Sequence, residues 1–233
     1  MKFETEITKI VKRTSDVKSF HMSRPSTFEY DAGQFMFVTI PSEFGELKKH
    51  FTISSSPTEE DFIEFTKKLT VSQYSNALNS LKIGDKMTID APYGKFVLEK
   101  DNKKIGMLSG GIGITPLRSM CKYSTDLKLK YDIILLYGNN SLEEIAFKEE
   151  LEKLSKENKN FKVIYTLNNF PSNWKGYTGF INSDMLKKEM PDYKSRIFYT
   201  CGPPAMVGAM KKLLSELNVP EEKIRTENFS GYN

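Results

Sequence analysis

Residues 108–116, Leu-Ser-Gly-Gly-Ile-Gly-Ile-Thr-Pro, combine residue types and spacing that predict binding of an anion. The stretch follows an apolar run typical of a buried strand and precedes residues that suit a helix. Glycines allow a tight turn and close approach of a ligand, and a helix N-terminus presents unpaired N–H groups. Pro116 suits the first helical position, where no N–H is needed. We therefore expect a pyrophosphate, and hence a dinucleotide, at Gly110, Gly111 and Gly113. The alternative is a glycine-rich turn without a ligand, because the third glycine of the common G-x-G-x-x-G pattern is absent.

Strands and helices alternate in the second part of the chain, which predicts a parallel sheet with helices on both faces. The predicted strands are residues 105–108, 133–137, 163–167 and 197–200. The predicted helices are residues 116–123, 142–154, 183–190 and 203–217. Ligands of such sheets bind outside the carboxyl ends of the strands. Four loops follow those strands, so we expect the glycine loop, residues 138–140, Asn168 and residues 201–204 to gather at one edge.

The first part of the chain, to residue 98, consists of short alternating segments and turns. The predicted strands are residues 2–12, 19–22, 34–40, 51–54, 62–69 and 86–91, and the single predicted helix is residues 75–81. Many short strands with one helix predict an antiparallel barrel. A polar linker at residues 99–103 follows. The expected fold class is thus β plus α/β: an antiparallel β-barrel domain at residues 1–98, then a parallel-sheet α/β domain at residues 99–233.

Composition narrows the class of protein. The 233 residues are 39% hydrophobic and 27% charged, which is typical of a folded, soluble chain. The net charge of +4 comes from interleaved basic and acidic residues and gives little support to a nucleic-acid partner. Two cysteines and two histidines do not suit a four-thiolate cluster or a structural zinc site, so no metal is expected. Without a signal peptide or an apolar run that spans a bilayer, we expect a cytoplasmic protein with no membrane partner.

Four motifs occur in order along nearly the whole chain: Lys-His-Phe-Thr-Ile-Ser-Ser at residues 49–55, Ala-Pro-Tyr-Gly-Lys-Phe at 91–96, the glycine loop, and Cys-Gly-Pro-Pro-Ala-Met at 201–206. In this order they resemble the ferredoxin–NADP reductase family. The resemblance implies a flavin-binding barrel that holds FAD, followed by a domain that binds NADH or NADPH. It also implies an FAD-dependent NAD(P)H oxidoreductase that passes hydride from the nicotinamide to the flavin.

The family's flavin motif, Arg-x-Tyr/Phe-Ser/Thr, matches residues 49–52. The resemblance implies that Phe51 lies against the flavin ring and that Thr52 sits beside the flavin N5. Lys49 stands at the arginine position and offers a point charge instead of a planar fork, so weaker flavin binding is expected. His50 should point away from the face of Phe51, with its backbone available to the ligand.

Further flavin contacts are implied on the next strand and at the start of the barrel helix, at Thr66, Lys67, Lys68, Tyr74 and Ser75. The two lysines point to opposite faces of a strand, so at most one should face the ligand. For Ser75, a plain helix cap and a phosphate contact are both open.

In the nucleotide domain, the resemblance places Thr115 at the nicotinamide and the glycine loop at the pyrophosphate. Asn139 and Asn140 match the segment whose last position, when arginine, holds the 2′-phosphate of NADP. Asn140 lacks that charge, so NADH is favoured and NADPH stays open. Cys201 would approach the nicotinamide where hydride leaves; the alternative is a buried structural cysteine. The adjoining positions expected to bind the cofactor are Gly202, Pro203, Pro204 and Met206.

The C-terminal residues match an acid and an aromatic that several family members place near the flavin: Glu227 and Phe229, with Tyr232 as a second aromatic. An aromatic over the flavin must move before the nicotinamide can stack, so the tail could gate access; the alternative is a frayed terminus. Thr52, Cys201 and Glu227 form the candidate catalytic set.

We expect an external electron acceptor, because the sequence has neither a cluster nor a heme domain. The first hypothesis is a redox protein such as a ferredoxin or flavodoxin. The alternatives are reduction of free flavins or ferric complexes, and a non-catalytic nucleotide-sensing or assembly subunit.

Overall fold

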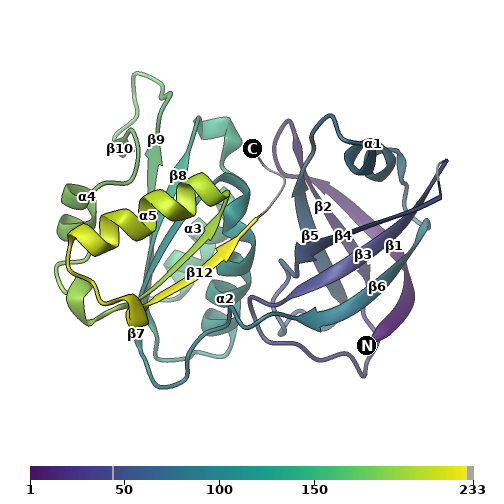
Figure 1. The fold of residues 1–233 in the computed structure, drawn as a ribbon, viewed down its shortest axis with the longest axis horizontal. Helices are drawn as coiled ribbons and strands as arrows, with labels where there is room; N and C mark the ends of the chain where they lie inside the picture. Colours follow the sequence, from purple (N-terminus) through teal and green to yellow (C-terminus); the bar gives the residue numbers. More distant parts are fainter. Residues whose placement is uncertain (44, 230–233) are drawn as a thin grey trace.

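The computed structural model describes residues 1–43 and 45–229, and its first half is an antiparallel barrel. The sheet order is β4-β3-β6-β1-β2-β5, with helix α1 (Gln73–Ser80) at one end (Figure 1). The strands are β1 (Lys2–Lys12), β2 (Val17–Ser23), β3 (Phe35–Ser42), β4 (Gly45–Thr52), β5 (Phe62–Lys68) and β6 (Lys86–Tyr93). Strands β4 and β5 stand at the two edges of this order. Their rings meet across the seam, since Phe51 stacks on Phe65 at 4.9 Å.

Alternation along the strands explains the barrel core. On β3, Met36, Val38 and Ile40 are fully buried. The alternate residues Phe35 and Phe37 point to the opposite face and are only partly buried. Each fully buried apolar side chain stabilises the fold by about 1.5–3 kcal/mol. The buried face of β3 therefore determines which side chains point into the barrel, and the side chains of its other face do not contribute to the barrel core.

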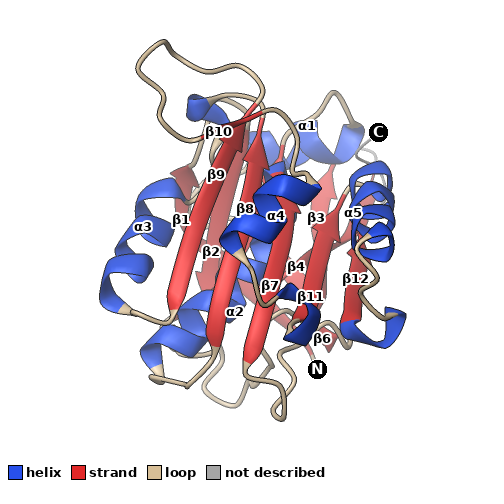
Figure 2. Cartoon of the chain, turned by 90° about the vertical axis from the view of Figure 1, so that its left-hand side faces the viewer, coloured by secondary structure: helices blue, strands red, loops and turns tan. Residues whose placement is uncertain are grey.

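The second half is the expected parallel α/β layer, with the strand order β10-β9-β8-β7-β11-β12 (Figures 1 and 2). Its strands are β7 (Lys104–Gly110), β8 (Asp132–Asn139), β9 (Phe161–Leu167), β10 (Tyr177–Thr178), β11 (Ile197–Gly202) and β12 (Ile224–Asn228). Its helices are α2 (Ile114–Asp126), α3 (Lys148–Glu157), α4 (Ser183–Glu189) and α5 (Pro204–Glu216). Helices α2 and α3 pack into the core on one face, and α4 and α5 into the core on the other. The predicted fold class is confirmed.

Several local expectations were wrong. The strand expected at residues 51–54 is instead β4, which begins at Gly45 and ends at Thr52, and the short strand β10 was not expected. Residues 142–154 are not one helix: a short 3-10 turn at Leu142–Glu144 is followed by a buried segment, and α3 begins only after Phe147, whose φ is +60°. That segment breaks the helix because its apolar side chains are buried in the core. Helix α2 begins at Ile114, so Pro116 is its third residue, where its missing N–H still has no helical partner. Strand β12 was not expected, because Ile-Arg-Thr-Glu-Asn has no apolar run.

Helix α2 joins the two halves. The Arg118 guanidinium donates to the Ser54 carbonyl at 3.0 Å and pairs with Glu59, and the Ser119 hydroxyl donates to the Ser55 carbonyl at 2.6 Å. Arg118 is almost fully buried. The helix that starts at the glycine loop is therefore held against the segment that directly follows Thr52.

None of the helices within the described part of the chain is both long and apolar enough to cross a membrane.

Candidate flavin and nucleotide site

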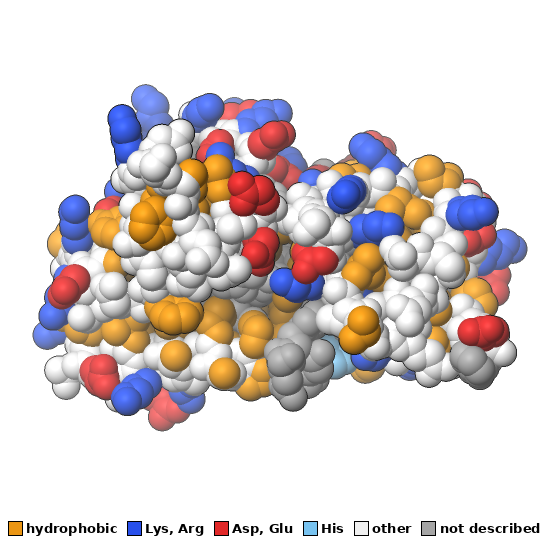
Figure 3. All heavy atoms as spheres, turned by 90° about the horizontal axis from the view of Figure 1, so that it is seen from above, with side chains coloured by type: hydrophobic (Ala, Val, Ile, Leu, Met, Phe, Trp, Pro, Cys, Tyr) orange, Lys and Arg blue, Asp and Glu red, His pale blue; other side chains and the backbone are white. Residues whose placement is uncertain are grey.

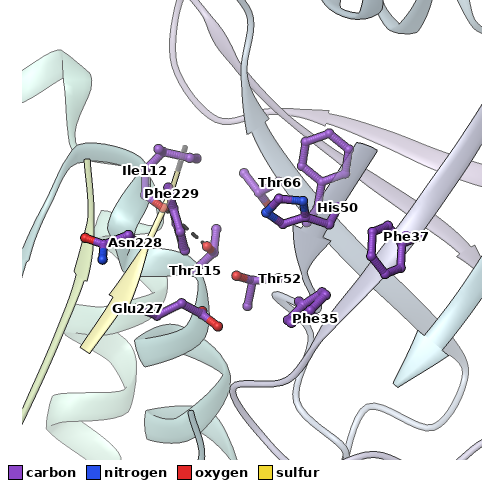
Figure 4. A pocket seen from close by; sticks show the side chains of 11 residues that line it. Phe35, Phe37, His50, Thr52, Thr66, Ile112, Thr115, Glu227, Asn228 and Phe229 are labelled. Carbon is purple, nitrogen blue, oxygen red and sulfur yellow. Dashed lines mark hydrogen bonds between the residues drawn. The ribbon is translucent and has the colours of Figure 1, made fainter. Parts of the chain in front are cut away.

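A cavity of about 320 Å³ lies where the two halves meet (Figure 4). Its walls come from the barrel strands β3, β4 and β5, from the start of α2, and from the end of β12. The residues that line it are Phe35, Phe37, His50, Phe51, Thr52, Thr66, Ile112, Thr115, Glu227, Asn228 and Phe229. We call it the flavin-side cavity. It brings together seven of the residues predicted from the sequence: His50, Phe51, Thr52, Thr66, Thr115, Glu227 and Phe229.

Strand β4 presents its residues to this cavity by alternation. Thr52 pairs with Phe35 and His50 pairs with Phe37 across β3, so these side chains share the outer face. The His50 side chain therefore points away from Phe51, as expected, and itself lines the cavity. Phe51 is 8% exposed, and its ring stacks on Phe65 within the barrel core. It thus reaches the cavity from the core side.

Two lysines gather beside the first turn of α1. Lys67 is buried and its ammonium donates to the Lys68 carbonyl at 3.0 Å, while the Lys49 ammonium lies 5.9 Å from the ring of Tyr74. Burial, and secondly the charge of Lys49, lower the pKa of Lys67 to about 8. A bound anion would stabilise the charged form of Lys67, which burial destabilises. The adjacent N-terminus of α1 also favours an anion. The cluster therefore fits the pyrophosphate of FAD.

Lys68 and Ser75, the other lysine and the serine considered for flavin binding, make contacts within the protein. Lys68 lies on the opposite side of β5 and pairs with Asp16 at 3.1 Å and Glu144 at 3.8 Å. Of these two lysines, only Lys67 lies close to Lys49. The cap of α1 is Ser72, which accepts from the Ser75 N–H at 3.2 Å; Ser75 is buried and accepts from the Thr70 N–H. The cap role considered for Ser75 was therefore wrong.

The glycine loop requires its glycines for close packing. A Cβ on Gly113 would lie 2.1 Å from the Cys201 carbonyl oxygen, and one on Gly110 would lie 2.8 Å from the Met206 sulfur. Gly111 has a φ of +52°, in the left-handed region. The Cys201 thiol donates to the Gly113 carbonyl at 2.8 Å. The turn from β7 to α2 is thus pressed against the end of β11 and leaves its backbone open to a ligand.

A second cavity, of about 560 Å³, lies along the carboxyl edge of the parallel sheet. We call it the nucleotide cavity. The residues that line it and were expected at this edge are Lys68, Ser109, Gly110, Gly111, Gly138, Asn139, Asn140, Asn168, Pro203 and Met206. The sequence did not indicate Glu144 or Phe180. The Ser109 hydroxyl is fully buried with no hydrogen-bond partner among the described residues, and buried polar groups normally have one. The Ser109 hydroxyl could therefore bond to a polar group of a ligand, so the cavity fits a nucleotide.

Strands β11 and β12 place an acid and a thiol side by side. Cys201 pairs in register with Glu227; Glu227 lines the flavin-side cavity, whereas Cys201 is fully buried and lines neither cavity. Burial raises the pKa of the Cys201 thiol, so the thiol stays neutral. Burial also raises the pKa of the Glu227 carboxyl to about 7, and its Oε2 has no partner among the described residues. Glu227 can therefore hold or release a proton near neutral pH.

Phe229, the C-terminal aromatic predicted near the flavin, is held by a backbone hydrogen bond. The Phe229 N–H donates to the Gly202 carbonyl at 2.8 Å, and the ring packs against the core of the α/β half. Tyr232, the other predicted aromatic, is outside the described residues. Pro204 begins α5 and is exposed, and it lines neither cavity.

Sequence reasoning missed Phe35 and Phe37, which line the flavin-side cavity from β3. Their signal was present in the alternation Phe35-Met36-Phe37-Val38, which puts two aromatic rings on the face opposite the buried Met36 and Val38. Basic and acidic side chains are interspersed over the face of the molecule that Figure 3 shows.

Comparison with known proteins agrees with this geometry. Residues 4–98 match the family model of an oxidoreductase FAD-binding domain, and residues 107–212 that of an oxidoreductase NAD-binding domain. NADH-cytochrome b5 reductase 1 from Aspergillus oryzae is 36% identical over 204 residues, which cover 82% of this chain and 70% of that protein. One subunit of the Na(+)-translocating NADH-quinone reductase from Pseudoalteromonas atlantica is 32% identical over 228 residues, which cover 89% of this chain and 55% of that protein.

Solved structures share the fold. The cytochrome P450 reductase GcoB of Amycolatopsis superposes with a TM-score of 0.86 at 19% identity, over 98% of this chain and 70% of that one. A ferredoxin NADP+ reductase from Neisseria gonorrhoeae with bound FAD and NADP superposes with a TM-score of 0.81 at 22% identity, over 97% and 98%.

A flavin barrel joined to a nicotinamide-nucleotide domain defines a two-domain class of oxidoreductase. The chain belongs to the ferredoxin–NADP reductase family. Its cofactors are accordingly FAD and a nicotinamide dinucleotide. The chain spans between 55% and 70% of the length of the two curated relatives described above.

Proposed function

We propose that this chain is an FAD-dependent NADH oxidoreductase that passes electrons to an external acceptor. The observation that carries the proposal is the flavin-side cavity, where Thr52 of the barrel, Thr115 of the nucleotide half and Glu227 of the last strand converge. When bound, FAD supplies the two-electron acceptor for the hydride of a nicotinamide. The domains divide at about residue 98, before the polar linker.

The barrel would hold FAD along the seam between β4 and β5. Lys49 and Lys67 neutralise the pyrophosphate beside Tyr74 and Ser75, and the hydroxyls of Thr52 and Thr66 border the ring site. Two lysines together compensate for the arginine that the motif lacks, since each contributes a point charge to the same anion.

The nucleotide half would orient NADH from the other side. The backbone of the glycine loop and the start of α2 receive the pyrophosphate, and Thr115 borders the path to the flavin. Cys201 contributes a small neutral side chain behind that path, and Glu227 is a proton store beside it. Phe229 lies on the cavity wall, so its displacement on nicotinamide entry would gate access.

Preference for NADH is supported by the charges of the nucleotide cavity. The Asn140 side-chain amide donates to the Glu144 carboxylate at 3.0 Å, and Lys68, the cation that lines the cavity, is already paired with Glu144 and Asp16. Lys148, another possible cation, pairs with Glu152 on the surface of α3. A 2′-phosphate would bring negative charge towards the Glu144 carboxylate, which disfavours NADPH.

The acceptor is proposed to be a separate molecule, with a redox protein as the first class. Reduction of free flavin or ferric complexes is a second candidate, because Lys49 replaces the arginine of the flavin motif. A non-catalytic nucleotide-sensing subunit would not need the convergence of Thr52, Thr115 and Glu227.

Two measurements on the purified protein, its visible absorption and its NADH oxidation, test the proposal. We expect copurified flavin with the absorption bands of bound FAD, and NADH oxidation with ferricyanide as an artificial acceptor. A colourless protein that reduces added flavin would favour the free-flavin reductase. A colourless protein that oxidises neither nucleotide, with or without added FAD, would refute the proposal.

A further inference from the structure

Five charged side chains of alternating sign cross the interface between the two halves, and we call them the interface charge chain. In order they are Glu64, Arg13, Glu150, Arg118 and Glu59. Arg118 and Glu150 belong to helices α2 and α3 of the nucleotide half, and the other three belong to the barrel half (Figure 1). The chain therefore crosses the interface twice, once between Arg13 and Glu150 and once between Arg118 and Glu59.

The ion pairs of the chain are close and largely shielded from water. Arg13 pairs with Glu64 at 2.7 Å and with Glu150 at 3.8 Å. Arg118 pairs with Glu150, and its two terminal nitrogens donate to the two carboxylate oxygens of Glu59, one of them at 3.0 Å. The side chains of Glu64 and Arg118 are only 1% and 4% exposed. Solvent therefore screens these pairs much less than it screens a surface ion pair.

The chain is connected to two opposite walls of the flavin-side cavity. On the nucleotide side, Arg118 lies one helical turn after Thr115, which lines that cavity. On the barrel side, the Ser54 hydroxyl donates to the Glu64 carboxylate at 2.7 Å and lies 3.0 Å from the hydroxyl of Thr66, another lining residue. The five charged residues themselves line neither the flavin-side cavity nor the nucleotide cavity. They can therefore affect the reaction only through the positions of these walls.

The two most buried members of the chain stay ionised at neutral pH. Burial alone would raise the pKa of Glu64, but its contact with His21 at 2.9 Å and the charges of the two arginines outweigh burial and lower that pKa to about 2. Burial alone would lower the pKa of Arg118, but the carboxylates around it raise that pKa instead. The attraction along the chain is therefore present under assay conditions.

Charge pairs constrain orientation in a way that the apolar contacts of this interface do not. The barrel residues Val17 and Ala32 join the apolar core of the nucleotide half, and such packing is non-directional. An arginine fork on a carboxylate instead fixes distance and orientation together. A buried ion pair contributes little net stability, because both ions lose their hydration, and selection of one arrangement is its better-attested use. The chain therefore suits a role in orientation more than one in stability.

We propose that the interface charge chain positions the nucleotide half on the barrel, so that the nicotinamide and the flavin meet at the distance that hydride transfer requires. The proposal rests on the proposed function, because it concerns the hydride that passes from NADH to FAD. Reacting atoms lie about 3–3.5 Å apart in a productive complex, and a displacement of about 1 Å can slow a reaction about a hundredfold. A small rotation between the halves therefore slows this step, while each cofactor keeps the contacts within its own half.

Anaerobic stopped-flow reduction of the FAD-loaded protein by NADH separates rate from affinity. The limiting rate at saturating NADH reports hydride transfer, and the half-saturating concentration reports NADH binding. Glu59→Gln and Glu150→Gln each remove one charge of the chain and keep the shape of the side chain. We expect each to lower the limiting rate about tenfold, with FAD retained and the half-saturating concentration within about twofold of that of wild type.

Two controls accompany these variants. Glu157→Gln changes another glutamate of α3, which borders the same surface cavity as the chain and pairs with Lys153, and it should leave the limiting rate unchanged. NADH deuterated at the transferred position should slow the same phase in wild type and in every variant, which identifies that phase as hydride transfer.

An unchanged limiting rate in both chain variants overturns the proposal, and so does weaker NADH binding or lower stability in urea without slower hydride transfer. If Glu59→Gln does not fold, Glu150→Gln, at a side chain that is 23% exposed, gives the same comparison. Failure of both variants to fold, or loss of FAD from both, also overturns it, since the chain would then serve stability or the cofactor. A wild type whose bound flavin is not reduced by NADH contradicts the proposed function itself.

Discussion

The carboxyl of Glu227 gives the site a measurable dependence on pH. Burial raises its pKa from 4.5 to about 7 in the folded chain. Between those values the folded protein holds a proton that the unfolded chain releases. The free energy of unfolding is therefore highest below about pH 4.5, where Glu227 is protonated in both states, and it falls as the pH rises through 7 and the buried carboxyl ionises. A tenfold change in proton affinity is worth about 1.4 kcal/mol, so the full difference is about 3 kcal/mol. Partial exposure of the side chain lowers our expectation to about 2 kcal/mol.

Glu227→Gln isolates this effect, because glutamine has the same shape and does not ionise. We expect the variant to unfold with the same free energy as wild type near pH 4.5 and to be more stable by about 2 kcal/mol near pH 8.5. Urea unfolding of the flavin-free protein, followed by the fluorescence of the single tryptophan Trp174, measures both. Glu222→Gln, at an exposed glutamate near the same strand, is the control and should leave the pH dependence unchanged. Parallel pH profiles for Glu227→Gln and wild type would refute the reasoning.

Three further changes test other parts of the site. Gly113→Ala should prevent the glycine loop from closing and cost roughly 2 kcal/mol or more, because its Cβ would lie 2.1 Å from a backbone oxygen of β11. Gly208→Ala, in the interior of α5 with nothing within 4 Å, should instead stabilise the fold against urea by about 0.5–1 kcal/mol. Lys67→Met should weaken FAD binding about tenfold or more, as measured by flavin titration. We expect the affinity of wild type to decline above about pH 8, as the Lys67 ammonium deprotonates, and the variant to lack that decline. Glu144→Gln should raise kcat/KM for NADPH relative to NADH about tenfold, whereas Glu143→Gln, outside the cavity, should not. Equal effects in a variant and its control, or FAD binding by Lys67→Met with the pH profile of wild type, would contradict the corresponding assignment.

The sequence contained enough information for both sheets and for the loop between them. Period-two alternation predicted the barrel strands except for most of β4, and apolar runs followed by turn residues predicted the carboxyl edge of the parallel sheet. These signals are local, since each comes from the pleat of a strand or the steric freedom of a glycine. Gly113 illustrates this: its need to be glycine is visible in the motif, and the structure supplies the neighbour, the Cys201 carbonyl.

Features that depend on tertiary contacts were not predictable in the same way. The helix expected at 142–154 is interrupted because Ile145, Ala146 and Phe147 are buried in the core before α3 begins. The polar strand β12 forms only because β11 offers an edge, and it brings Glu227 to the cavity. The position of Lys67 beside Lys49 likewise depends on how β4 approaches β5.

Hydride transfer from NADH to the bound flavin is the central claim, and one anaerobic mixing experiment tests it most directly. FAD-loaded protein mixed with an equivalent of NADH should lose its visible flavin bands within the mixing experiment, faster than with NADPH, and regain them when ferricyanide is added. Flavin bands that persist with NADH and with NADPH, in protein that retains its FAD, would contradict the account.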